Sequence, residues 1–485
     1  MRNFLFFSLI ISISFAGFEV ETLPPPVFHN HSFALLSNSR YSVHSGFSSS
    51  LPNQVLANIL WAMAKVPRIG SYQEIYVATP TNVYRYDPNT HTLVLHLAGN
   101  HRSNANAAFE IGIATERYEE AGFATQVGLL ASVAFWDSGG SNVVSCPMQS
   151  ATNYANSNWQ PIHPIRLVNV HGRGTVRGLD TTCLAISSDS TLPRPLTRGN
   201  DTLEVLLNNL QMDSLFISGE IPLTKISQIL WAGYGVAPHM TANSRRGLTV
   251  PSAVANYYLT GKIYLVRDSG VYRYHNRLPS GSLNTADHRL QILVSGDRRG
   301  ELRSASPRIP QTAPVYFVVT VTDTTSNYQM LEAGFVGIQF LLQAQGLGLA
   351  SFLTCPLSPT ERNAIRNALS LPSNEFPVLV SSVGERLTAL KERYAQIKKI
   401  SLSSPNQIPI KIEFWVEKSG IAQFFIYDLS GRPIRSFKKV FTKEGYHYWE
   451  WDGRDEKGEN TSPGIYFLYA QVGGRKVIRK IVKIR

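Results

Sequence analysis

The chain has 485 residues, of which 43% are hydrophobic and 16% are charged, so it is long enough for two to four domains and is not broadly disordered. The formal net charge is +12, but the basic residues are spread along the chain without a nucleic-acid-binding motif, and we expect no nucleic acid partner. The three cysteines form neither a Cys-x-x-Cys pair nor a metal-binding spacing, so no metal site is predicted.

The N-terminus has the pattern of a secretory signal peptide. Arg2 precedes an apolar run over residues 4–15, and Ala16 supplies a small residue next to a cleavage position. We therefore expect residues 1–17 to be a signal peptide and the protein to be exported to the periplasm, the cell surface or the medium. Residues 18–50, rich in Ser, His and Asn, are predicted to be a solvated linker.

The chain then repeats itself. Ile-Leu-Trp-Ala occurs at 59–62 and 229–232, Val-Tyr-Arg-Tyr at 83–86 and 271–274, Glu-Ala-Gly-Phe at 120–123 and 332–335, and Cys-Pro at 146–147 and 355–356. Matches in one order over such a long unit favour a duplicated domain over a short structural repeat. We predict two tandem α+β copies, a degenerate one over 51–175 and a second over 206–400. A linker over 176–205 joins them, and together they form an intramolecular pseudo-dimer.

Periodicity places the main elements of the second copy. Leu223, Ile226, Ile229 and Leu230 fall at helical spacing, and strands are predicted over 263–266, 271–274, 315–321 and 377–380. A long helix is predicted over 328–345, and a further helix opens at residue 359 with Ser358 as its cap. The last strand of the first copy is predicted over 164–168.

The C-terminal residues 403–485 follow a different pattern. Strands are predicted over 410–416, 422–427, 446–451, 465–471 and 477–484, and turn residues such as Asp452-Gly453 and Pro463-Gly464 separate them. Short strands at this regular spacing predict a small β-sandwich.

A basic stretch over 244–256 is the main candidate for a binding site. Arg245 and Arg246 together present many N–H donors and two fixed charges, which suit a phosphate group, although a solvated basic loop explains the same residues. Pro251-Ser252-Ala253 follow as a tight segment of small residues. The first copy lacks this stretch, because 13 residues separate Trp61 from Ile75 where 31 separate Trp231 from Ile263.

Together these motifs resemble the nitroreductase family and, within it, the SagB-type dehydrogenases of thiazole/oxazole peptide biosynthesis. The resemblance covers residues 220–386 and, more weakly, 50–175. It is carried by Arg245-Arg246 with Thr249-Val250-Pro251-Ser252-Ala253, by Gly270 to Tyr274, by Leu331 to Gly334 and by Gly346-Leu347-Gly348.

The resemblance implies an FMN-dependent oxidoreductase with the flavin at the interface of the pseudo-dimer. Arg245 and Arg246 would hold the phosphate, Gly346-Leu347-Gly348 would line the phosphate side, and Pro251, Ser252 and Ala253 would lie along the isoalloxazine. Thr249 and Asn256 are included among the expected cofactor contacts. The flavin would carry the chemistry, so no catalytic side chain is predicted.

The chain departs from the family pattern in three places. Gly247-Leu248 are inserted after the arginines, Val254 stands where the family has a glycine, and the first copy lacks the pocket segment. We therefore expect at most one FMN site in the chain.

The C-terminal strands resemble the FlgD-like immunoglobulin domain and the related sorting domain of type IX secretion. Tyr427-Asp428, Trp451-Asp452-Gly453 and Pro463-Gly464 carry this resemblance. It implies contact with an outer-membrane secretion machinery.

Two functions remain open from the sequence. The first is an exported FMN-dependent oxidoreductase acting on an unknown small molecule or peptide. The second is a non-enzymatic secreted or surface protein that keeps the scaffold and has lost the flavin.

Overall fold

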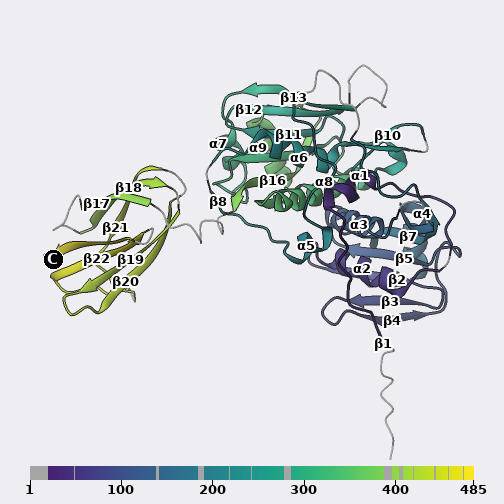
Figure 1. Ribbon diagram of the computed structural model, residues 1–485, viewed down its shortest axis with the longest axis horizontal. Helices are drawn as coiled ribbons and strands as arrows, with labels where there is room; N and C mark the ends of the chain where they lie inside the picture. The colour runs from purple at the N-terminus through teal and green to yellow at the C-terminus, as the bar shows by residue number, and fades with distance from the viewer. Residues whose placement is uncertain are drawn as a thin grey trace, which may run out of the picture.

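The computed structural model describes residues 20–48, 50–137, 141–183, 191–217, 219–241, 243–277, 286–386, 396–402, 408–418, 420–441, 444–456, 458–472 and 475–484. The predicted signal peptide lies outside these residues. Among the residues described, no helix has the length and apolar character to cross a membrane. Figure 1 shows a larger body of helices and sheets and a smaller module of strands that contains the C-terminal end.

The first lobe of the body is an antiparallel sheet with helices against it. Its strand order is β1-β4-β3-β2-β5-β7-β6. The strands are β1 (Val20–Thr22), β2 (Gln73–Ala78), β3 (Asn82–Asp87), β4 (Thr92–Ala98), β5 (Phe109–Thr115), β6 (Ser141–Met148) and β7 (Ile165–Thr175). The helices are α1 (Phe33–Ser39), α2 (Asn53–Ala64), α3 (Tyr118–Val133) and α4 (Gln149–Asn158).

The second lobe has the strand order β13-β12-β11-β14-β16-β15, with β8 added beside β16. Its strands are β8 (Phe216–Ile217), β11 (Ile263–Arg267), β12 (Gly270–Arg277), β13 (Ala286–Ser295), β14 (Val315–Val321), β15 (Leu349–Thr354) and β16 (Phe376–Arg386). The helices are α5 (Leu203–Asn208), α6 (Leu223–Tyr234), α7 (Arg299–Ala305), α8 (Asn327–Gly346) and α9 (Pro359–Ala368). Apart from β1 and β8, the two sheets have the same strand order when β2 to β7 are matched in sequence with β11 to β16.

The repeated sequence motifs occupy matching elements in the two lobes. Ile-Leu-Trp-Ala lies in α2 and α6, Val-Tyr-Arg-Tyr in β3 and β12, and Glu-Ala-Gly-Phe in α3 and α8. A side-chain contact also recurs, because the Tyr86 hydroxyl lies 2.7 Å from His91 Nδ1 and the Tyr274 hydroxyl lies 2.9 Å from His288 Nδ1. Matching residues therefore make matching contacts.

The lobes differ most between the first long helix and the sheet. In the second lobe this connection contains the antiparallel pair β9 (Val236–Met240) and β10 (Arg246–Leu248), followed by a 3-10 turn over Ala253–Ala255. In the first lobe residues 65–72 connect α2 directly to β2 without a helix or strand. The extra length noted in the sequence thus forms a hairpin that only the second lobe has.

Helices α3 and α8 pack against each other through matching glycines. A Cβ on Gly122 would lie 2.4 Å from the Leu331 carbonyl oxygen, and a Cβ on Gly334 would lie 2.2 Å from the Glu119 carbonyl oxygen. Gly122 and Gly334 are equivalent in the repeat, and so are residues 119 and 331. The contact of Gly122 with residue 331 is therefore matched by the contact of Gly334 with residue 119. This reciprocal pattern is the one found at a two-fold interface between identical subunits.

The helices and strands predicted in the second copy are confirmed. The long helix is α8, and Ser358 caps α9 through a capping box in which its side chain accepts from Glu361 N. The strands predicted over 164–168 and 377–380 extend further, as β7 and β16.

The prediction of a solvated linker over 18–50 is wrong. Ser32 caps α1 by accepting from Leu35 N, and Phe33 and Leu36 of this helix are buried in the main core. Upstream, His29 Nδ1 lies 2.8 Å from Glu204 Oε1. The polar composition of this stretch misled the prediction, because Ser32 caps a helix and Asn38 donates to the Asp180 carbonyl at 2.6 Å.

The C-terminal module consists of two antiparallel sheets around a core of its own. One has the order β17-β18-β21 and the other β20-β19-β22-β23. The strands are β17 (Gln396–Leu402), β18 (Ile410–Lys418), β19 (Gly420–Asp428), β20 (Pro433–Phe441), β21 (Gly445–Trp451), β22 (Gly464–Val472) and β23 (Arg475–Lys483). The five predicted strands are present, and β17 and β20 were missed. Both missed strands are rich in lysine, arginine and serine, which weakens the apolar alternation.

Candidate functional site

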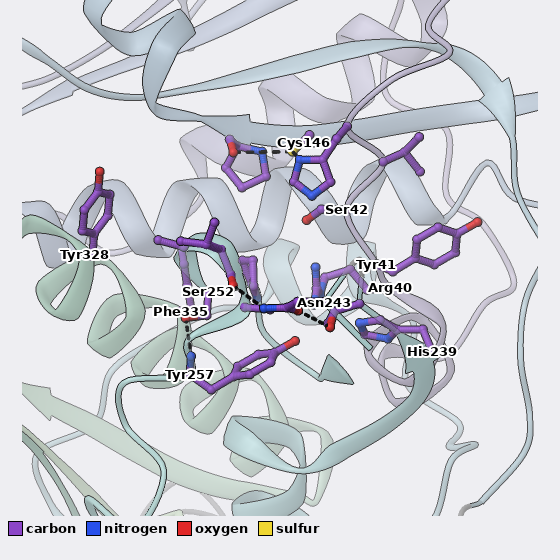
Figure 2. Close-up of a pocket in the computed structure, with 18 of the residues that line it drawn as sticks. Arg40, Tyr41, Ser42, Cys146, His239, Asn243, Ser252, Tyr257, Tyr328 and Phe335 are labelled. Carbon is purple, nitrogen blue, oxygen red and sulfur yellow. Dashed lines mark hydrogen bonds between the residues drawn. The ribbon is translucent and has the colours of Figure 1, made fainter. Parts of the chain in front are cut away.

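A cavity of about 900 Å³ lies between the two lobes. The first lobe contributes residues 40–44, which follow α1, and Cys146 and Pro147 of β6. The second lobe contributes the hairpin and turn residues over 239–257, together with Tyr328, Leu331 and Phe335 of α8. Its volume is within the range of cavities that bury a cofactor or a drug-sized ligand. Figure 2 shows the lining side chains facing one another across the cavity.

Arg40 is the cation buried in the wall of this cavity. The residue is only 2% exposed, its Nε donates to the Thr249 carbonyl at 3.1 Å, and its Nη2 donates to the Leu248 carbonyl at 3.0 Å. Nη1 has no hydrogen-bond partner among the residues described. Burial lowers the pKa of Arg40 to about 10, so the side chain is still charged at neutral pH. A buried positive charge with an unpartnered N–H donor is stabilised by an anion that accepts from it.

His239 of β9 lies beside Arg40 and is kept neutral. Burial is the main cause that holds its pKa well below the usual range, and the charges of nearby arginines, Arg40 first among them, add to the effect. Its Nδ1 has no hydrogen-bond partner among the described residues. Gly247 permits this placement, because a Cβ there would lie 1.7 Å from His239 Nε2. The histidine is therefore a neutral hydrogen-bonding group.

The polar groups of the cavity favour an anionic ligand. Among the described residues that line it, none is an aspartate or a glutamate, whereas Arg40 supplies a permanent positive charge. On the side of the first lobe, Cys146 Sγ lies 3.2 Å from His44 Nδ1. Burial raises the pKa of the Cys146 thiol to about 12, so the sulfur keeps its proton. The rest of the wall is largely apolar, as a flat aromatic ligand requires.

The structure divides the predicted site residues among different places. Pro251, Ser252 and Ala253 line the cavity between the lobes. Gly346 and Leu347 line a separate cavity of about 350 Å³ at the start of α6, where Lys225 Nζ donates to the Leu347 carbonyl at 2.8 Å. Gly348 follows them in a left-handed conformation with φ 72°. The structure thus does not bring the Gly-Leu-Gly segment to the same cavity as Pro-Ser-Ala.

The two adjacent arginines do not line the cavity. Arg245 Nη1 donates to the Ala255 carbonyl at 3.2 Å, and Arg246 Nη1 donates to the Pro238 carbonyl at 2.7 Å. Both guanidinium groups contact main-chain carbonyls of the same connection between α6 and β11.

The remaining predicted residues also lie beside the cavity and not in its wall. The carbonyl of Thr249 accepts from Arg40 and from Gln126 and Gln339 of the two central helices, so Thr249 supports the wall from behind. Asn256 Nδ2 donates to the Tyr258 hydroxyl at 2.8 Å on the exposed side.

Glu332 of α8 connects this helix to α6 and to the segment that leads from the cavity wall to β11. It is 1% exposed, and its Oε1 accepts from the Tyr234 hydroxyl and, at 3.2 Å, from Leu259 N. Burial raises the pKa of this carboxyl to about 7. The equivalent Glu120 accepts from Ile69 N at 2.9 Å and from Gly70 N at 2.8 Å, so it anchors the shorter connection in the same way.

Two residues of the cavity wall, Cys146 and Leu331, have sequence equivalents in the repeat that contact each other. The Cys355 thiol, equivalent to Cys146, lies 3.8 Å from Glu119 Oε1, and both residues are buried. Glu119 is the equivalent of Leu331, which lines the cavity between the lobes. The Glu119 carboxyl group thus contacts the Cys355 thiol, whereas their equivalents Leu331 and Cys146 line an open cavity.

Comparison with known proteins identifies the second lobe. The family model of the nitroreductases matches residues 216–385. This segment is therefore similar to a nitroreductase family domain. It contains the cavity residues over 239–257 and those of α8, whereas Arg40 and Cys146 lie outside it.

The comparison with solved structures matches proteins that are described as putative or FMN-dependent nitroreductases. One from Anabaena variabilis is 11% identical, covers 73% of this chain and 99% of its own, and has a TM-score of 0.48. One from Ralstonia eutropha is 22% identical, covers 43% and 96%, and has a TM-score of 0.33. An FMN-dependent nitroreductase from Clostridium difficile is 16% identical, covers 37% and 85%, and has a TM-score of 0.27. The search of curated proteins found no match.

Sequence reasoning missed Arg40, His239 and Tyr257. Arg40 lay in the supposed linker, and its contact with Thr249 spans 209 positions, which no local pattern reveals. His239 and Tyr257 lie on either side of the basic stretch that was singled out. The available signals were their positions in the sequence. His239 and Tyr257 flank the basic stretch, and Arg40 lies before the first repeat.

Proposed function

We propose that this protein is an FMN-dependent oxidoreductase that holds a single flavin in the cavity between its lobes. The nitroreductase family domain over residues 216–385 supports the reaction class. The observation that carries the cofactor is the unpartnered Nη1 of the buried Arg40, in a cavity of about 900 Å³ without lining carboxylates. An anionic phosphate group on a large, mostly flat molecule fits such a wall.

The residues present divide into a polar end and a flat wall. Arg40 would hold the phosphate, with His239 as a neutral hydrogen-bonding neighbour. Pro251, Ser252 and Ala253 would lie along the ring system, and Phe335 of α8 adds an apolar contact. When bound, FMN accepts and donates hydride equivalents, so the protein needs to supply binding, orientation and exclusion of water.

The two lobes are proposed to be tandem copies that form a pseudo-dimer. The matching strand orders, the matching Tyr–His contacts and the reciprocal glycine contacts of α3 and α8 support this proposal. The contact of Glu119 with Cys355 supports a stoichiometry of one flavin per chain.

Finer features of the proposal rest on sequence motifs. The Arg-Arg and Pro-Ser-Ala segments favour a dehydrogenase of the SagB type acting on a small molecule or peptide. The signal-like N-terminus favours export to the periplasm, the cell surface or the medium. The strand pattern of the C-terminal module favours an Ig-like sorting domain that contacts an outer-membrane secretion machinery.

The proposal is tested by purifying the mature chain and recording its absorption spectrum before and after adding FMN. We expect a flavin band and an equivalence point at one FMN per chain. A colourless protein that takes up no FMN would overturn the proposal. It would instead support a non-enzymatic scaffold, which Val254, in place of the family's glycine, already favours.

A further inference from the structure

The turn over residues 254–257 has a costly backbone. Val254, Ala255 and Tyr257 have φ values of 48°, 53° and 52°, in the left-handed region that side chains with a Cβ rarely adopt. A β-branched residue there is a genuine outlier. The Val254 side chain is 79% exposed, so its own packing does not hold it in place. Such a turn persists only where its surroundings impose it.

The loop between β9 and β10 imposes this turn. Asn243 Nδ2 donates to the Val254 carbonyl at 2.9 Å, and Arg245 Nη1 donates to the Ala255 carbonyl at 3.2 Å. Both acceptors are carbonyls of left-handed residues. Within the turn, Tyr257 N donates to Ser252 Oγ at 2.8 Å and closes it. Figure 2 shows Asn243 beside the turn, at the edge of the cavity.

The loop is itself braced, so that its side chains are held in position. Thr241 Oγ1 donates to Asn243 Oδ1 at 2.7 Å and accepts from Arg245 N at 3.1 Å. The main chain adds a bond from Thr241 N to the Arg245 carbonyl at 2.8 Å. Thr241 thus orients both residues that contact the turn.

The turn forms part of the cavity wall. Ser252, Ala253, Val254, Ala255 and Tyr257 all line it, so the conformation of the turn sets the shape of the wall. The hairpin that holds the turn exists in the second lobe, and the first lobe has a connection without a helix or strand at this place.

We infer that Asn243 and Arg245 are positioning residues, which clamp the left-handed turn over 254–257 and so shape the wall that receives the flavin ring. This inference rests on the proposed function for its consequence. It gives Arg245 a task different from holding phosphate, since its guanidinium group already bonds a carbonyl of the turn.

The test compares two flavins that differ in the phosphate group. Dissociation constants of FMN and riboflavin are measured by flavin fluorescence quenching for wild type and Arg245→Ala. A clamp predicts that both constants rise by the same factor, about tenfold, because the whole wall is affected. In Arg245→Ala/Val254→Gly both constants should return to within about threefold of wild type, because glycine adopts the left-handed turn at little cost.

Arg366→Ala is the matched control, because Arg366 Nη1 also donates to a main-chain carbonyl, that of Ser373 at 3.1 Å, outside the cavity. This variant should leave both constants unchanged. A loss confined to FMN in Arg245→Ala, or no rescue by Val254→Gly, would overturn the clamp and favour a phosphate contact.

Urea unfolding of the same variants tests the clamp without any flavin. Arg245→Ala should lower the unfolding midpoint in the wild-type background and lower it less in the Val254→Gly background. Equal decreases in the two backgrounds would overturn the inference. If wild type binds neither flavin, the proposed function fails, while the urea measurements still decide the clamp.

Discussion

At the scale of single residues, the balance of charge in the cavity depends on Arg40. Its guanidinium group donates to the carbonyls of Leu248 and Thr249, and its buried Nη1 has no partner among the described residues. A hydrogen bond to a charged group contributes about 1.5–3 kcal/mol. The residue therefore serves two purposes, since it joins the lobes and presents a charge between them.

Replacing Arg40 should separate the two flavins. We expect Arg40→Gln to weaken FMN binding roughly tenfold to a hundredfold and riboflavin binding by less than about threefold, because only FMN carries the phosphate. Isothermal titration with each flavin measures both effects. Equal losses for the two flavins would place the phosphate elsewhere.

Glu332 should make stability depend on pH in an unusual direction. Its pKa is raised by burial from 4.5 to about 7, so the folded protein binds the proton more tightly than the unfolded chain does. The stabilisation is fully present below pH 4.5 and is lost as the pH rises through 7, a decrease of about 3 kcal/mol in the free energy of unfolding. Chemical denaturation at pH 5 and pH 8 measures it.

Glu332→Gln should remove this slope, because the amide oxygen can still accept from Tyr234 and Leu259. Glu361→Gln is the control. Hydrogen bonding to Arg308 lowers the pKa of Glu361 to about 2, so its contribution lies at more acidic pH and the slope between pH 5 and 8 should remain. A slope that survives in Glu332→Gln would assign it to other groups.

At the scale of elements, the packing of α3 on α8 determines where the cavity wall stands. Leu331 and Phe335 lie on α8 next to the contact glycine Gly334, and both line the cavity. Any shift of one helix relative to the other therefore moves the wall.

Enlarging either contact glycine should separate these helices. The added Cβ of Gly122→Ala would lie 2.4 Å, and that of Gly334→Ala 2.2 Å, from a backbone oxygen of the opposite helix. We expect each variant to lose about 1–3 kcal/mol of stability, with weaker flavin binding. Gly300→Ala in α7, with no atom within 4 Å of the added Cβ, should be neutral or slightly stabilising. Thermal unfolding of the three variants checks this.

The sequence was sufficient for helices α6, α8 and α9 and strands β11, β12, β14 and β16 of the second lobe, and for part of its site. Apolar spacing located α6 and α8, and the contiguous Pro251-Ser252-Ala253 segment could be recognised because all of it lies in one stretch. The roles of Arg40 and Arg245 could not be predicted in this way. They follow from burial and from contacts between distant segments, and the strain in Val254 is a property of the folded backbone.

At the scale of the whole molecule, the C-terminal module is separate from the cavity between the lobes. It has its own hydrophobic core, and none of the residues lining the cavity belongs to it. The body should therefore bind its ligand without the module.

A chain that ends after residue 386 should retain the site. We expect its dissociation constant for FMN to stay within about twofold of the full-length value, because the cavity is built from residues 40–335. Fluorescence titration of both proteins measures this. A large loss of affinity would show that the module contacts the body near the site.

Because both walls of the cavity belong to one chain, diluting the protein should not separate them. In a two-subunit protein, a site at the interface disappears when the subunits dissociate, so its occupancy depends on protein concentration. Here Arg40 and the 251–257 wall belong to one polypeptide, and the connection between the lobes keeps their local concentration high. The site would therefore stay assembled even at very low protein concentration.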